Sequence, residues 1–189
     1  MKHLFTLVII LFCTESFAQL TDYTYTPEGK LLFTEVITEE GKSQPGLYKL
    51  AQDVYSEIPK RKKELEDENF SLSIEQKLTL HEKGILSRIP YADIQFDMKL
   101  EFKDGRYRYL LSDFEFLPYE RNRYGKYVVL QRKRKDLESV VDTEEWKSHS
   151  ETFLQAIEAE IAYLNMAMHG NPVSLNETNE KTVEVSEEW

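Results

Sequence analysis

The sequence predicts an α+β domain in which an antiparallel sheet of four to five strands carries two helices on one face. Residues 96–116 alternate between apolar and polar side chains on both sides of Asp104-Gly105, a pattern typical of two long strands joined by a tight turn. Apolar residues at helical spacing occupy one segment before this hairpin and one after it. The chain has 189 residues, 41% of them hydrophobic, which suffices for one domain with its own core.

The N-terminus has the pattern of a signal peptide, predicted to span residues 1–18. A short basic start precedes an apolar stretch at 4–12, far shorter than the roughly 20 residues that cross a bilayer. Small residues at positions 16 and 18 suit signal peptidase, so cleavage is predicted after Ala18. Lipidation of Cys13 is the weaker alternative, because large side chains precede it where a lipidation signal has small ones.

Export predicts a location in the periplasm or in association with the outer membrane, with no transmembrane span in the mature chain. Cys13 is the only cysteine, and its removal leaves no disulfide, thiol nucleophile or cysteine metal ligand. The net charge of −10 opposes binding to nucleic acid and to anionic lipid, so no nucleic-acid partner is expected.

The predicted domain spans residues 31–169, between a flexible leader at 19–30 and a disordered acidic tail at 170–189. Its first strand is the run of β-branched and apolar residues at 31–38. The charged segment at 60–69 is expected to be a connector without regular structure.

A helix is predicted at 44–58, capped by Ser43 or Gln44, with Pro45 in its first turn. A proline directly after this segment ends the helix. Its apolar positions recur at helical spacing: Leu47, Leu50, Ala51, Val54 and Ile58.

The next strand is predicted over residues 72–80, with Gln76 as the one polar side chain on its apolar face. Gly84 and Pro90 are expected to bracket the loop that follows. The apolar face carries Leu72, Ile74, Leu78 and Leu80.

The hairpin turn at Asp104-Gly105 is predicted to be of type I′, which requires a positive φ at both residues. A two-residue turn fixes the register and brings Glu101 opposite Arg108 on the polar face. On the apolar face it pairs Phe102 with Tyr107, Leu100 with Tyr109, and Met98 with Leu111.

The alternation changes phase after Leu111. Without a correction, Asp113 would lie on the apolar face opposite Phe96, while Phe114 and Phe116 would lie on the polar face. A β-bulge near residues 112–113 is therefore predicted, because one extra residue returns the large side chains to the core.

A long C-terminal helix of roughly 26 residues is predicted to cover the sheet, beginning at a capping box of Asp142 and Glu145 and ending at Gly170. A short further strand is expected at 127–131. The core-facing side chains of the helix are Trp146, Phe153, Leu154, Ile157, Ile161, Leu164 and Met168.

The order strand, helix, strand, hairpin, helix, with KDGRYRYLLSDFEF following an alternating FDMKLEF strand, resembles a family of secreted Bacteroidetes proteins. That family is described as a domain of unknown function with a TATA-binding-protein-like fold. The resemblance covers residues 31–116 and is most specific at 103–109. It implies an antiparallel sheet with helices on one face and no catalytic residue, and a shared fold does not transfer DNA binding.

No catalytic residue, metal site or cofactor is predicted. His81, His149 and His169 show no metal-binding spacing such as HxxxH and are expected to be solvated or hydrogen-bonded. The nucleophile motif GxSxG and the phosphate-binding motifs GxGxxG and GxxxxGK[ST] are absent. The many carboxylates lie in charge runs that are typical of solvated surface.

The segment at 119–135 interleaves basic and tyrosine side chains and is the candidate site for an anionic partner. Stacking rings and cations together bind anionic chains, here a glycan, lipopolysaccharide or an acidic protein. Structural use, or self-pairing with the acidic residues of the same chain, is the leading interpretation of the segment, and an external anionic partner is the second. The candidate residues are Arg121, Arg123, Tyr124, Lys126, Arg132, Lys133 and Arg134.

Three function hypotheses follow. The first is a non-catalytic binding or accessory protein of the cell envelope, whose partner is a protein or an anionic glycan. The second is a carrier with an apolar cavity under the long helix for a lipid-like ligand, lined by Phe96, Met98, Trp146 and Phe153. The third is a hydrolase, which requires a cleft with two convergent titratable groups.

Overall fold

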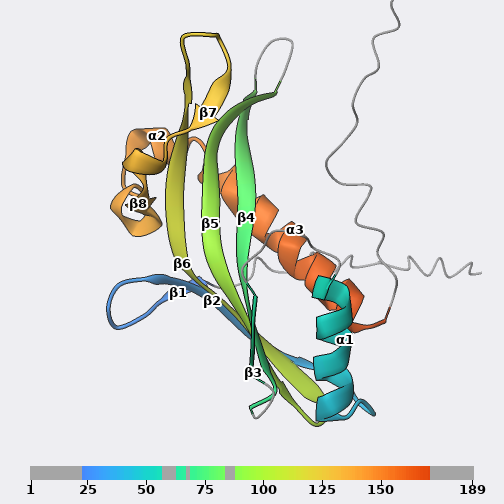
Figure 1. The fold of residues 1–189 in the computed structure, drawn as a ribbon. Coiled ribbons are helices and arrows are strands. Elements are labelled where there is room, and N and C mark those ends of the chain that lie inside the picture. Colours follow the sequence, from blue (N-terminus) through green and yellow to red (C-terminus); the bar gives the residue numbers. More distant parts are fainter. Residues whose placement is uncertain (1–22, 57–62, 67–68, 84–87, 171–189) are drawn as a thin grey trace, which may run out of the picture.

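The computed structural model describes residues 23–56, 63–66, 69–83 and 88–170 (Figure 1). It confirms the α+β class, with a large antiparallel sheet and helices packed on one face of it. The predicted signal peptide and acidic tail lie outside the described residues, except for Gly170 at the start of the tail. Within the described ranges, no helix is both long enough and apolar enough to cross a membrane.

Within the described residues, eight antiparallel strands form the sheet, in the order β1-β2-β6-β5-β4-β3, with β7 and β8 also paired to β6. Four of them are only two to four residues long, too short for alternation to show in the sequence, so four to five strands were predicted. The strands are β1 Tyr23–Tyr25, β2 Leu31–Thr38, β3 Lys63–Glu66, β4 Ser71–Lys83, β5 Arg88–Lys103, β6 Arg106–Arg121, β7 Tyr127–Val129 and β8 Lys135–Asp136.

Three segments predicted as irregular belong to the sheet. β1 lies inside the predicted leader and pairs with β2. β3 lies inside the predicted connector and pairs with β4. Pro90 lies within β5, opposite His81, and not at the end of a loop. The register of β4 and β5 shifts next to this pair, and such an irregularity accommodates a proline, which cannot donate a ladder hydrogen bond.

Helix α1 spans Gln44–Ser56 and is capped by Ser43, whose Oγ accepts a hydrogen bond from the Gly46 N–H at 3.3 Å. Its buried face consists of Leu47, Tyr48, Ala51 and Tyr55. The two tyrosines were not among the predicted core positions. The last predicted positions of this helix lie outside the described residues.

The hairpin of β5 and β6 has the predicted register, including Glu101 opposite Arg108, whose Nε donates to the Glu101 carboxylate at 2.9 Å. The type I′ prediction was wrong, because only Gly105 of the turn has a positive φ, at 71°. Contacts outside the hairpin determine the turn. Asp104 accepts a hydrogen bond from the Gln44 N–H at 2.8 Å, and the Gly105 N–H donates to the Lys42 carbonyl at 2.9 Å.

The predicted β-bulge is confirmed. Phe96 lies opposite both Asp113 and Phe114, because the register shifts between Gln95 and Asp97. Asp113 is the bulged residue, with a φ of 54°, and its carboxylate is paired with Lys30. Phe114 and Phe116 therefore return to the buried face, as predicted.

The predicted long helix is divided into α2, Glu144–Lys147, and α3, Ser150–Met168. Thr143, and not Asp142, is the N-cap, because its side chain accepts a hydrogen bond from the Trp146 N–H at 3.2 Å. Ser148 and His149 then hydrogen-bond the Glu145 carbonyl with their side chains, at 2.7 and 3.0 Å. These side-chain contacts compete with the helical ladder at the break. Gly170, with a φ of 86°, ends α3 as predicted.

The core lies between the sheet and the helices α1 and α3, which cover the same face in Figure 1. Aromatic rings fill its centre: Phe96 stacks on Phe114 with centroids 5.2 Å apart, and Phe153 contacts Phe114 at 5.8 Å. Gln76 is buried on this face, as predicted from its position, and its Nε2 has no hydrogen-bond partner within the described part of the chain.

Replacing Gly105 by Val should lower the free energy of unfolding by about 2 kcal/mol, because a β-branched residue resists a positive φ. Urea denaturation measures the change. Gly105→Asn is the matched control, because asparagine tolerates this conformation and an added Cβ meets no atom within 4 Å. Equal midpoints for the Val variant and the parent would contradict the assigned backbone conformation.

Candidate functional site

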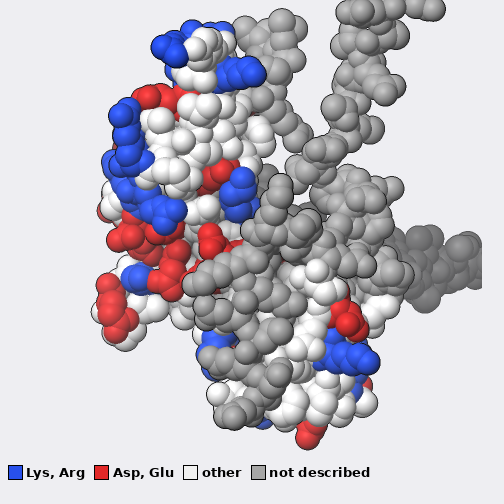
Figure 2. All heavy atoms as spheres, in the orientation of Figure 1, with Lys and Arg blue, Asp and Glu red and all other residues white. Residues whose placement is uncertain are grey.

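The structure divides the seven predicted anion-binding residues into two groups. Arg121, Arg123, Tyr124 and Lys126 surround the turn between β6 and β7, and residues 121–126 are named the tip loop here. Arg132, Lys133 and Arg134 lie in or directly after the short 3-10 helix η1, Gln131–Lys133. Figure 2 shows basic side chains gathered at the top of the view, over the β6–β7 hairpin, and a second group lower on the left.

Asn122 organises the tip loop. Its side-chain Oδ1 accepts hydrogen bonds from the backbone N–H groups of Tyr124 and Lys126, at 2.9 and 3.0 Å. Its own N–H donates to the Lys126 carbonyl at 2.8 Å, and the Gly125 N–H donates to the Asn122 carbonyl at 2.9 Å. The loop is therefore held in one conformation by local bonds, as asparagine typically does in turns.

The cations of the tip loop have no carboxylate partner within the described residues. Arg121 donates from Nε to the Gly125 carbonyl at 3.0 Å. The Arg123 guanidinium lies 4.7 Å from the centre of the Tyr124 ring, in cation–π geometry. Tyr124 is 71% exposed. The loop thus presents three positive charges and one aromatic ring to solvent.

Two of the three cations of the η1 group are neutralised by the chain itself. Lys133 Nζ lies 2.7 Å from a carboxylate oxygen of Glu120, and this contact lowers the pKa of Glu120. Arg134 lies 3.1 Å from Glu115. Arg132 has no ion pair within the described residues. Self-pairing, the leading interpretation of the basic segment, therefore describes Lys133 and Arg134, and the anion-binding interpretation fits the tip loop.

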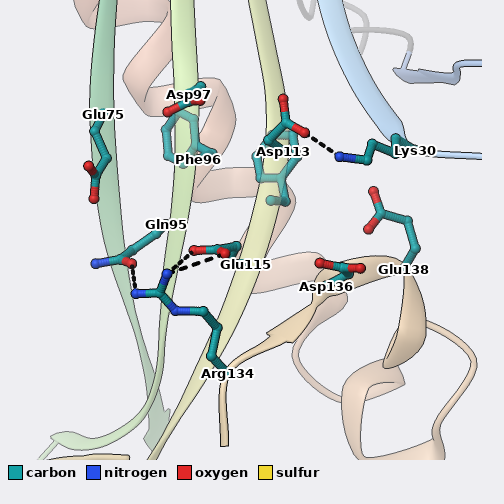
Figure 3. Close-up of a pocket in the computed structure, with 11 residues that line it drawn as sticks. Lys30, Glu75, Gln95, Phe96, Asp97, Asp113, Glu115, Arg134, Asp136 and Glu138 are labelled. Atoms are coloured by element: carbon teal, nitrogen blue, oxygen red, sulfur yellow. Dashed lines mark hydrogen bonds and ion pairs between the residues drawn. The ribbon is translucent and has the colours of Figure 1, made fainter. Parts of the chain in front are cut away.

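Arg134 borders a hollow of about 280 Å³ on the face of the sheet opposite the helices (Figure 3). Its guanidinium points toward Glu115 and toward Gln95, whose Oε1 lies 3.3 Å from Nη2. The surroundings are acidic, with six carboxylates against two cations, so this hollow repels anions. The carboxylates are Glu75, Asp97, Asp113, Glu115, Asp136 and Glu138.

A second hollow, named the Tyr91 pocket here, has a volume of about 410 Å³ and lies where β4, β5, β6, β7 and α2 meet. Ring side chains form much of its wall: Pro90, Tyr91, Phe116, Pro118, Tyr119 and Tyr127. Ile89 and four charged side chains complete the lining: Glu82, Lys133, Lys135 and Glu145. The pocket therefore includes one predicted site residue, Lys133, and several residues that the sequence analysis did not select.

Tyr91 is held rigidly at the base of this pocket. Its ring stacks on the His149 ring with centroids 3.7 Å apart and meets the edge of Phe116 at 5.6 Å. Burial, and then the charges of Glu145 and Glu82, together raise the pKa of Tyr91 to about 12. The phenol is therefore neutral and remains a hydrogen-bond donor at physiological pH.

Tyr119 is fixed on a second wall. Its hydroxyl donates to the buried carboxylate of Asp93 at 3.2 Å, which also accepts from Thr79 at 2.7 Å and pairs with Lys77 at 3.1 Å. Burial, and then the charge of Asp93, raise the pKa of Tyr119. The Asp93 carboxylate therefore holds together side chains of β4 and β6.

The side chains expected to line a carrier cavity fill the space under the helix themselves. Phe96, Met98, Trp146 and Phe153 are all buried, and the Trp146 and Phe153 rings lie 5.4 Å apart. The two pockets described above lie elsewhere, on the opposite face and at the end of the sheet. This packing is the outcome that the binding-protein hypothesis expects.

The histidines differ in their surroundings. His149 packs on Tyr91, and His169 Nδ1 lies 2.6 Å from the carboxylate of Glu39, a buried residue that also pairs with Lys42 at 2.8 Å. Among the described residues, no group of three or more His, Cys, Asp or Glu has the arrangement of a metal site.

Two solved structures are similar to this chain. A TBP-like protein from Parabacteroides distasonis superimposes with a TM-score of 0.55 at 17% sequence identity, over 76% of this chain and 95% of that one. A DUF4468 family protein from Bacteroides ovatus gives a TM-score of 0.48 at 13% identity, over 78% of this chain and 90% of that one. No protein-family model and no curated protein matches the sequence. The first of these structures supports a TBP-like fold, and a shared fold leaves function to be argued from the site.

The Tyr91 pKa should fall from about 12 toward its ordinary value of 10 when Glu145 is replaced by Gln, although burial keeps it above 10. The ring Cζ chemical shift in ¹³C NMR follows the titration. Since unfolded tyrosine releases its proton near pH 10 and folded Tyr91 near 12, this group stabilises the fold below pH 10 and its contribution is lost between pH 10 and 12.

Glu144→Gln is the matched control for this titration, because Glu144 is the neighbouring carboxylate and pairs with Lys147. An unchanged Tyr91 pKa in the Glu145 variant, or an equal fall in the Glu144 variant, would contradict the geometry assigned to the pocket.

Proposed function

We propose that the chain is an exported, non-catalytic binding or accessory protein of the cell envelope, and that the tip loop is the surface by which it contacts an anionic partner. The observation that carries the proposal is the tip loop itself: three cations without carboxylate partners in the described part of the chain, beside the exposed ring of Tyr124. Elsewhere in the basic segment, Lys133 and Arg134 are neutralised by Glu120 and Glu115.

The rigidity of the tip loop favours binding. Because Asn122 already fixes the turn, little backbone freedom remains to be lost when a partner docks. Arginine and tyrosine are also the side chains that protein interfaces use most, since they combine large contact area with directed hydrogen bonds.

The charge distribution restricts which partner can dock and where. The chain has a net charge of −10, so an anionic partner is repelled by most of the surface and attracted at the tip loop. An anionic glycan or an acidic protein of the envelope fits this arrangement.

Reversing two charges of the tip loop, in the variant Arg123→Glu with Lys126→Glu, should weaken binding to immobilised polygalacturonate at least about tenfold, because attraction becomes repulsion. Binding of the parent should weaken as NaCl increases. Two other immobilised polymers serve as comparisons. Dextran is a polysaccharide without charge, and polyglutamate carries carboxylates, as polygalacturonate does, but has no sugar rings. Biolayer interferometry measures all three.

The matched control is Lys103→Glu with Arg106→Glu, which changes the net charge equally at the β5–β6 turn. This control should bind nearly as well as the parent. Equal losses in both double variants would show that net charge alone governs binding and would overturn the role of the tip loop.

Export makes a separate prediction. When the complete sequence is expressed in a bacterium with two membranes, the periplasmic fraction should contain a chain whose intact mass corresponds to Gln19–Trp189. Native mass spectrometry measures it. A mass that retains residues 1–18, or one that includes a lipid on Cys13, would overturn cleavage after Ala18.

A further inference from the structure

The Tyr91 pocket has no part in the proposed tip-loop contact. Its volume of about 410 Å³ lies in the range of small-molecule sites, about 300–1,000 Å³. The rings in its wall come from three strands, β5, β6 and β7, and the 40% exposed ring of Tyr127 is the most accessible among its tyrosines. Aromatic and proline rings therefore form much of the surface that a ligand in this pocket contacts.

The charges of the pocket cancel. Lys133 and Lys135 oppose Glu82 and Glu145, so the lining selects neither an anion nor a cation. Lys133 is already paired with Glu120, whereas Lys135 has no ion pair within the described residues. The lining thus offers ammonium donors and carboxylate acceptors to the same ligand.

The combination of ring side chains with balanced charges in the pocket fits a sugar better than an acyl chain or a simple anion. An acyl chain would press apolar surface against four charged groups, which is costly because those groups lose their water. A simple anion would meet Glu82 and Glu145. A sugar ring presents apolar C–H faces that stack on aromatic rings, and hydroxyl groups that both donate to carboxylates and accept from ammonium groups.

The walls are fixed before any ligand arrives. Tyr91 is held between His149 and Phe116, and Tyr119 is held by Asp93. A preformed pocket with placed polar groups binds with a smaller loss of conformational freedom.

We propose that the Tyr91 pocket binds a neutral saccharide. Tyr127 supplies the stacking surface for a sugar ring, and Lys135 and Glu82 bind its hydroxyl groups. This inference does not depend on the tip loop, because an uncharged saccharide gains nothing from the cations there.

The test uses the mature chain and three neutral trisaccharides: maltotriose, cellotriose and N,N′,N″-triacetylchitotriose. Saturation-transfer difference NMR should show transfer to the ring C–H protons of at least one of them, and titration gives its Kd. Tyr127→Ala should weaken that binding about tenfold, and Lys135→Ala should weaken it several-fold.

Matched variants control for nonspecific effects. Tyr25→Ala removes a tyrosine that is 54% exposed from β1, also a three-residue strand, and Lys103→Ala removes an exposed lysine from the β5–β6 turn. Both should keep the parent Kd. Absence of transfer to all three trisaccharides at millimolar concentration, or an unchanged Kd in Tyr127→Ala, overturns the proposal. Since the tip loop is tested with polyanions, either result leaves the proposed function to its own experiment.

Discussion

The apolar face of β4, β5 and β6 must be shielded from water, and the remaining features of the fold follow from how α1 and α3 shield it. The hydrophobic effect requires this cover, because three strands of 13 to 16 residues expose a wide apolar surface. Phe153 of α3 and Leu47 of α1 are buried in the resulting core. A hydrogen bond between the start of α1 and the β5–β6 turn supports this arrangement. The Gln44 N–H donates to the Asp104 carboxylate.

The same strand that forms the floor of the core also builds the candidate sites. β6 contributes Phe114 and Phe116 to the core, then Tyr119 to the Tyr91 pocket, and ends at Arg121 of the tip loop. Both candidate sites therefore rest on backbone that the core already holds in place. Rigid scaffolds of this kind position loop residues for binding.

Features that depend on the alternation of apolar and polar residues along the chain could be predicted from the sequence. Alternation gave the strand register, and the phase change at Asp113 gave the bulge, because large apolar residues must return to one face. Features that depend on distant contacts were not predictable. The Gln44 bond helps to set the turn at Asp104. Glu120 and Glu115 neutralise Lys133 and Arg134 only after β6, η1 and β8 are brought together. The lining of the Tyr91 pocket comes from several strands and helices that are far apart in the sequence. No residue spacing along the chain could therefore predict the pocket.

The bulge at Asp113 divides β6 into two halves that are out of phase with each other. Below it, residues 106–111 pair with β2, and above it residues 115–121 pair with β8 and β7. Loss of a single residue here would restore one continuous phase and turn every side chain above it to the opposite face. The extra residue is therefore what keeps Phe114 and Phe116, above the bulge, in the same core as the apolar residues below it.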